Sequence, residues 1–118
     1  MTVSHWIGGS QVPSTGATQP ILDPSTGQQI GSVALADAAV VDQAVQDAVR
    51  AAKAWGRVSL AKRTDIMYAF RQLLVENTDE LARIISREHG KTVPDAAGEI
   101  ARGRESVEFA CGIASHLK

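Results

Sequence analysis

The chain has 118 residues, of which 44% are hydrophobic, 21% charged and 4% aromatic, and its formal net charge is -1. This length suits one domain, and the composition is typical of a globular protein rather than of a disordered segment. The interleaved charges form no basic patch for a nucleic acid, and no apolar run approaches the roughly 20 residues that cross a bilayer.

Residues 1–36 are predicted to form a small β-ribbon. The opening residues Met1–His5 lack the basic and apolar stretches of a signal peptide, which favours a cytoplasmic protein. The turn signal Gly8-Gly9-Ser10 separates two short extended runs, and Asp23–Gly27 is a β-turn signal ahead of an alternating segment over 28–35. Strands this short cannot stand alone, which favours a ribbon or an edge hairpin. In an intact oligomer the ribbon is expected to reach towards another subunit.

Residues 37–118 have a helical period and are predicted to form four helices, so the expected fold class is α+β and mostly helical. Asp37, Ser59 and Thr78 are the candidate N-caps of the first three helices. Gly56 and Gly90 are placed to end the first and the third. The expected inward residues are Val41, Val45, Ala48, Ala52 and Trp55 in the first helix, Ile66, Phe70, Leu73 and Leu74 in the second, and Leu81, Ile84 and Ile85 in the third.

The fourth helix starts at Thr92-Val93-Pro94, runs towards Leu117, and is predicted to have two apolar faces. The preceding helices can cover one face, whereas no further segment remains to cover the other. We therefore expect the chain to be an incomplete part of a larger fold. Three glycines, which each cost about 1 kcal/mol inside a helix, indicate that another backbone approaches closely. The first face has Ile100, Val107, Cys111, Ala114 and Leu117, the second has Arg102, Phe109 and Ile113, and the glycines are Gly98, Gly103 and Gly112.

Most of the motifs that suggest chemistry have a simpler structural explanation. His89–Thr92 ends like a phosphate-binding loop, but the glycine required five positions before Gly90 is Ile85, and a helix rather than a strand leads in. Cys111, the single cysteine, lies on an apolar helical face and is interpreted as a buried structural thiol. The three histidines are scattered, so no metal site is predicted.

Arg102 is the one residue for which the pattern leaves two readings open. Its aliphatic stem could lie across Phe109 and Ile113 while the guanidinium reaches water. Alternatively, the planar donor fork could bind a carboxylate in an otherwise apolar pocket. Arg104, on the other face, is interpreted as a structural ion-pair partner or as a residue whose charged end reaches solvent.

Several blocks of residues resemble the amino-terminal segment of the aldehyde dehydrogenase superfamily, in order and at the right spacings over essentially the whole chain. They are Trp6–Gly9, Asp23–Gly27, Ala48–Trp55 with Arg63, Glu88–Thr92, and Gly98–Glu99. Asp23 and Ser25 stand where the family more often has Asn and Ala. Within the superfamily, the runs Ser86–Thr92 and Gly98–Gly112 most resemble methylmalonate-semialdehyde dehydrogenase, the coenzyme A-acylating branch.

This resemblance implies an enzyme of valine catabolism that oxidises malonate or methylmalonate semialdehyde with NAD and yields an acyl-coenzyme A. Arg102 matches the arginine of the Gly-Glu-Val-x-Arg-Gly block, which implies that it contacts the substrate carboxylate. Ile100 replaces the valine of that block. The resemblance further implies that the chain is part of a cofactor-binding domain, and that the nucleophilic cysteine, the general-base glutamate, the oxyanion-hole asparagine and the dinucleotide-binding units lie beyond Lys118.

We therefore expect an amino-terminal fragment that is inactive alone, with no catalytic, cofactor-binding or metal-binding residue of its own. The full-length enzyme is expected to use NAD and coenzyme A and to form a homo-oligomer, without a nucleic-acid or membrane partner. Two alternatives stay open: a fragment of a different, coenzyme A-independent aldehyde dehydrogenase, or a non-catalytic helical interaction module.

Overall fold

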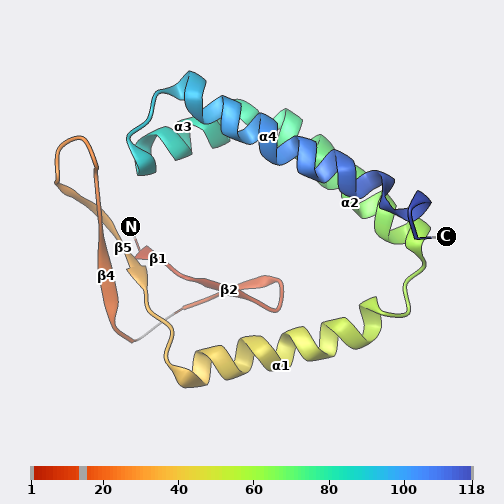
Figure 1. Ribbon diagram of the computed structural model, residues 1–118. Helices are drawn as coiled ribbons and strands as arrows, with labels where there is room; N and C mark the ends of the chain where they lie inside the picture. Colours follow the sequence, from red (N-terminus) through yellow and green to blue (C-terminus); the bar gives the residue numbers. More distant parts are fainter. Residues whose placement is uncertain (1, 14–15, 118) are drawn as a thin grey trace. The chain divides into compact units, whose positions relative to one another are not determined.

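The computed structural model describes residues 2–13 and 16–117, and these form five short strands followed by four α-helices (Figure 1). The α+β, mostly helical fold class predicted from the sequence is therefore confirmed. By their internal contacts the residues group into two compact units, one up to Arg57 and one from Val58 onward. The division predicted from the sequence, a strand segment over 1–36 and a helical segment over 37–118, is based on secondary structure and not on these contacts.

The first unit begins with two small sheets. In the three-stranded sheet, β5 (Gln29–Ala34) pairs antiparallel with β4 (Thr18–Leu22) and parallel with β1 (Thr2–Val3). The second sheet is the hairpin of β2 (His5–Ile7) and β3 (Ser10–Val12). The sequence predicts the hairpin and the turn that precedes β5, but neither the pairing of β4 with β5 nor the parallel pairing of β1.

Glycine backbone angles explain the turn between β2 and β3, and local hydrogen bonds explain the turn between β4 and β5. Gly8 and Gly9 both have positive φ angles, 63° and 80°, which a two-residue hairpin turn of this kind requires. In the second turn, Asp23 Oδ1 accepts hydrogen bonds from the backbone N–H groups of Ser25, at 2.7 Å, and Thr26, at 3.3 Å. An aspartate thus supplies the acceptor that an asparagine would supply at this position.

Helix α1 (Ala38–Trp55) completes the first unit. Its predicted cap is confirmed, since Asp37 Oδ1 accepts from the backbone N–H of Val40 at 2.9 Å. The predicted burial of its apolar stripe is wrong, because α1 contains no buried residue and Val41 and Val45 are exposed. The element of this unit that packs on α1 is the short strand β2, which is too small to cover the stripe.

The second unit consists of α2 (Leu60–Glu76), α3 (Thr78–His89), α4 (Val93–Gly112) and a terminal 3₁₀ turn (Ile113–Ser115). Helices α2 and α3 both pack against α4 (Figure 1). The core consists of Ala82, Ala96 and Ile100, with Leu81, Ile85 and Ala97 packed around it. The inward position predicted for Leu81 and Ile85 is therefore confirmed.

The helix ends of this unit follow the sequence prediction with two exceptions. Ser59 and Thr92 cap α2 and α4, and Gly90 ends α3 in the left-handed conformation with φ 77°. The prediction that Thr78 caps α3 is wrong, because its hydroxyl donates back to the carbonyl oxygens of Leu74 and Val75 at the end of α2. Helix α4 also ends at Gly112 rather than near Leu117.

The inward stripe that apolar spacing predicts for α2 is wrong for three of its four residues. Ile66, Phe70 and Leu73 are exposed, whereas Leu74 is half-buried. The less exposed side of α2 also includes Met67 and Arg71. The α2 stripe, as we call Ile66, Phe70 and Leu73, is therefore not the face that α2 presents to its own unit.

The glycines of α4 have more space than the sequence suggests. A Cβ atom added at Gly98, Gly103 or Gly112 would meet nothing within 4 Å outside the local helix backbone and neighbouring residues. The expected close approach of another backbone is therefore not made by the part of the chain that the structure describes.

Candidate functional site

Helix α4 has the two different faces that its sequence predicts. Ile100 and Cys111 are buried on one face, against the rest of the second unit. On the opposite face, Phe109 is 69% exposed, and Ile113, the first residue of the 3₁₀ turn that follows α4, is 42% exposed. The described residues thus leave this second face of α4 accessible.

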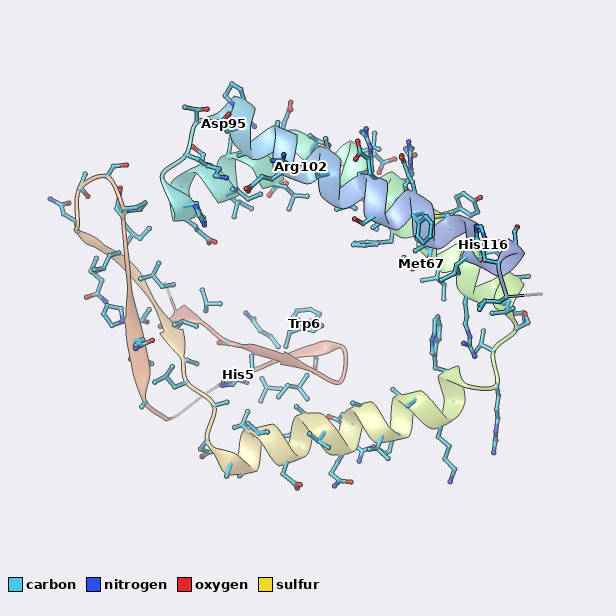
Figure 2. The ribbon with its side chains drawn as sticks, in the orientation of Figure 1. His5, Trp6, Met67, Asp95, Arg102 and His116 are labelled. Atoms are coloured by element: carbon cyan, nitrogen blue, oxygen red, sulfur yellow. The ribbon has the colours of Figure 1, made fainter. Side chains whose placement is uncertain are left out.

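Arg102 lies in the middle of α4, on its exposed side (Figure 2). Its guanidinium makes no hydrogen bond or ion pair with another residue in the described part of the chain. Only its backbone carbonyl is used further, as an acceptor from Ser106 Oγ at 3.4 Å. A fork of charged donors is therefore available to a ligand at this point of α4.

Phe109 has a partner that the sequence does not reveal. Its ring stacks on that of His116, with the ring centroids 6.1 Å apart and the planes 22° from parallel. His116 immediately follows the 3₁₀ turn, which brings the imidazole back over α4. The exposed aromatic ring on the Arg102 side of α4 is thus partly engaged by the end of the second unit.

The carboxylate of Glu99 is close enough to Arg102 to be affected by its charge. The Lys91 ammonium forms a hydrogen-bonded ion pair with the Glu99 carboxylate. That hydrogen bond has the largest effect on the pKa of Glu99 and lowers it; desolvation has the second largest effect and raises it, and the charges of Lys91, His89 and Arg102 each lower it by less. Because Glu99 is held ionised by Lys91, it is poorly suited to act as a general acid.

The other candidates have structural roles. Cys111 is buried and borders an open hollow of about 470 Å³ that is also lined by Tyr68 and Gln72. At this hollow, the Glu108 carboxylate is 2.8 Å from Arg71 Nη2 and 3.5 Å from Arg104 Nε. Arg104 is therefore the ion-pair partner that the sequence predicts, and Cys111 the buried thiol.

Within residues 2–13 and 16–117, no three His, Cys, Asp or Glu side chains lie where they could jointly hold a metal ion. Among the helices described, none is both long and apolar enough to cross a membrane. The glycine turns join strand to strand at Gly8-Gly9 and at Gly27, and helix to helix at Gly90. The described elements thus contain no strand, glycine-rich turn and helix of the kind that binds a dinucleotide.

Residues 11–118 match the family model described as the aldehyde dehydrogenase family, and the chain belongs to this family. It is 43% identical over 117 residues to the malonate-semialdehyde dehydrogenase of Pseudomonas aeruginosa. The aligned region is 99% of this chain and 24% of the relative. A malonate-semialdehyde dehydrogenase of Geobacillus kaustophilus is 42% identical over 95% of the chain and 23% of its own length. The chain thus spans about a quarter of the length of these relatives.

Solved structures give the same assignment. A Sinorhizobium meliloti protein, assigned as a methylmalonate-semialdehyde dehydrogenase and complexed with NAD, superposes with a TM-score of 0.96 at 41% identity, over 100% of this chain and 24% of its own. The methylmalonate-semialdehyde dehydrogenase of Oceanimonas doudoroffii gives a TM-score of 0.96 at 38% identity, over 99% of this chain and 24% of its own. The fold described above is therefore that of a segment of these enzymes.

Proposed function

We propose that the chain is the amino-terminal part of an NAD-dependent, coenzyme A-acylating dehydrogenase for malonate or methylmalonate semialdehyde, and that Arg102 binds the substrate carboxylate. The observation that carries the proposal is the unpaired guanidinium on the open face of α4. It is supported by the names of the relatives, which are 42–43% identical to this chain over the aligned residues. The chain alone is proposed to be inactive.

The chemistry of the substrate explains why an arginine suits this place. A semialdehyde of this class has a carboxylate at one end and the reactive aldehyde at the other. A planar guanidinium can donate two parallel hydrogen bonds to that carboxylate, which fixes both its position and its orientation. Arg102 would therefore select carboxylated aldehydes over simple ones and orient the aldehyde end towards the reacting groups.

The cofactors belong to the whole enzyme. When bound, NAD takes up the hydride and coenzyme A takes up the acyl group. Because the described residues include no dinucleotide-binding turn, we assign none of them to either cofactor. Their proposed contribution is substrate recognition by Arg102 and the scaffold that holds it.

The role of Arg102 is tested by Arg102→Leu in the full-length enzyme. Hydrogen bonds to charged groups contribute about 1.5–3 kcal/mol, so their loss should lower kcat/KM for malonate semialdehyde by roughly 10- to 100-fold. The kcat/KM for propanal should fall far less. Arg83→Leu, which removes an exposed arginine from α3, serves as the matched control and should affect neither substrate. Equal losses for both aldehydes in Arg102→Leu would contradict the assignment.

The acylating step is tested separately by product analysis. With coenzyme A present, the enzyme should convert the semialdehyde into a thioester and release carbon dioxide. Turnover to a free carboxylic acid at the same rate without coenzyme A would instead favour a coenzyme A-independent aldehyde dehydrogenase.

A further inference from the structure

The freedom of Arg102 requires an explanation, because an acidic residue lies beside it. Glu99 precedes Arg102 by three positions in α4, and side chains at this spacing are neighbours on a helix surface. An acidic residue on the amino-terminal side of a basic one is also the more favourable order. A Glu99 without another partner would therefore pair with Arg102 and occupy the donors that a carboxylate ligand needs.

Lys91 supplies that other partner from outside the helix. It follows Gly90, whose left-handed conformation turns the chain between α3 and α4. Ser86 Oγ donates to the backbone carbonyl of Lys91 at 2.7 Å and fixes this connection. The Lys91 side chain is only 25% exposed, against 42% for Glu99, so the lysine is the better-ordered member of the pair.

We propose that Lys91 is a positioning residue: by engaging Glu99 it keeps the Arg102 guanidinium free for the substrate carboxylate. This inference rests on the proposed function of Arg102. In this arrangement Lys91 does not touch the substrate. It determines which of two carboxylates, that of Glu99 or that of the substrate, the arginine binds.

The test is a set of variants of the full-length enzyme. Lys91→Met releases Glu99 and should raise KM for malonate semialdehyde about threefold more than KM for propanal, with little change in kcat. The double variant Lys91→Met/Glu99→Gln removes the competing charge and should restore KM for malonate semialdehyde to the parent value. A threefold change corresponds to about 0.65 kcal/mol, which is within the range of about 0.2–1 kcal/mol for an exposed ion pair.

Glu105 provides the matched control. It follows Arg102 by the same three positions by which Glu99 precedes it, which is the less favourable order for an ion pair, and no ion pair with a described residue engages it. The variant Lys91→Met/Glu105→Gln should therefore keep the raised KM. Should Lys91→Met not fold, Lys91→Gln allows the same comparison.

The outcomes separate the two proposals. If Arg102→Leu discriminates between the substrates but Lys91→Met does not, or if Glu105→Gln rescues as well as Glu99→Gln, the role of Lys91 is overturned and that of Arg102 stands. If Arg102→Leu fails to discriminate, the proposed function itself fails. Selective rescue by Glu99→Gln supports both.

Discussion

At the scale of single residues, the Lys91–Glu99 pair makes stability depend on pH in a definite direction. The hydrogen bond from Lys91 lowers the pKa of Glu99 in the folded chain. The stabilisation is therefore present above the pKa of Glu99 in the unfolded chain, and it is lost as the pH falls through the lower folded value. Since both side chains are partly exposed, we expect a modest effect.

We predict that Lys91→Met raises the pKa of Glu99, because the main stabiliser of its charged form is removed. A titration followed through the carboxyl carbon of Glu99 by NMR measures this directly. Lys62→Met, at a lysine of α2 without an ion pair to another described residue, should leave the Glu99 titration unchanged. An identical titration midpoint in Lys91→Met would show that the ion pair does not persist in solution.

Residues whose partners are close in sequence were predictable. Asp37 and Ser59 cap their helices through backbone groups three positions away, so spacing alone indicates their role. The stacking of Phe109 on His116 was not predictable, because it depends on where α4 stops and a 3₁₀ turn begins. Arg102 lies between these cases: its exposure follows from the helical pattern, whereas its proposed ligand comes from the family resemblance.

At the scale of elements, helix existence and most boundaries followed from caps and glycines, apart from the cap of α3 and the end of α4, but the choice of buried face did not. The α2 stripe is the more apolar side of α2, yet the other side of α2 is the less exposed one. The buried core of this unit lies between α3 and α4, is built from Ala82, Ala96 and Ile100, and includes no residue of α2. Apolar spacing identifies a face that is suitable for burial, but it cannot tell which of two suitable faces a partner within the unit uses.

The glycines of α4 give an element-scale prediction. In the 118-residue chain, Gly98→Ala and Gly103→Ala should each stabilise α4 by about 1 kcal/mol, because alanine is the better helix former and the added Cβ meets no atom within 4 Å beyond the local helix. Gly90→Ala should instead destabilise the chain, since its φ of 77° is unfavourable for alanine. Chemical denaturation followed by circular dichroism measures all three.

The same substitutions test whether another backbone contacts α4 in the longer protein. If Gly98→Ala stabilises the 118-residue chain but lowers the stability of the full-length enzyme, a partner segment lies against that glycine. Destabilisation already in the 118-residue chain would mean that α4 is packed differently from the structure described here.

At the scale of the whole molecule, the two units bury little. Their buried apolar residues within the described ranges are Ala34, Ala82, Ala96, Ile100 and Cys111. The chain of 12.5 kDa exposes 8620 Å². Two separate folded globules of half that mass would together expose only about 7,400 Å² by the usual relation between surface and mass. The larger exposed area indicates that surface suited to burial is exposed to solvent.

The sequence predicted the exposed face of α4 but not the full extent of the exposed apolar surface. The second face of α4 was expected to be open, and Phe109 and Ile113 are exposed there. The α2 stripe and the apolar side of α1 were expected to be buried, and they are open as well. The apolar pattern of the sequence therefore predicts more burial than the described residues provide by themselves.

We predict that the 118-residue chain associates with itself, because exposed apolar surface of this kind is seldom left in water. Sedimentation equilibrium over a wide concentration range should show a mass that rises above 12.5 kDa. Phe70→Ser and Phe109→Ser should weaken this association, since each removes an exposed aromatic ring from a different helix. Glu105→Ser, an exposed polar position of α4, is the control and should not weaken it. A monomer at every concentration would show that these faces are less open in solution than in the structure.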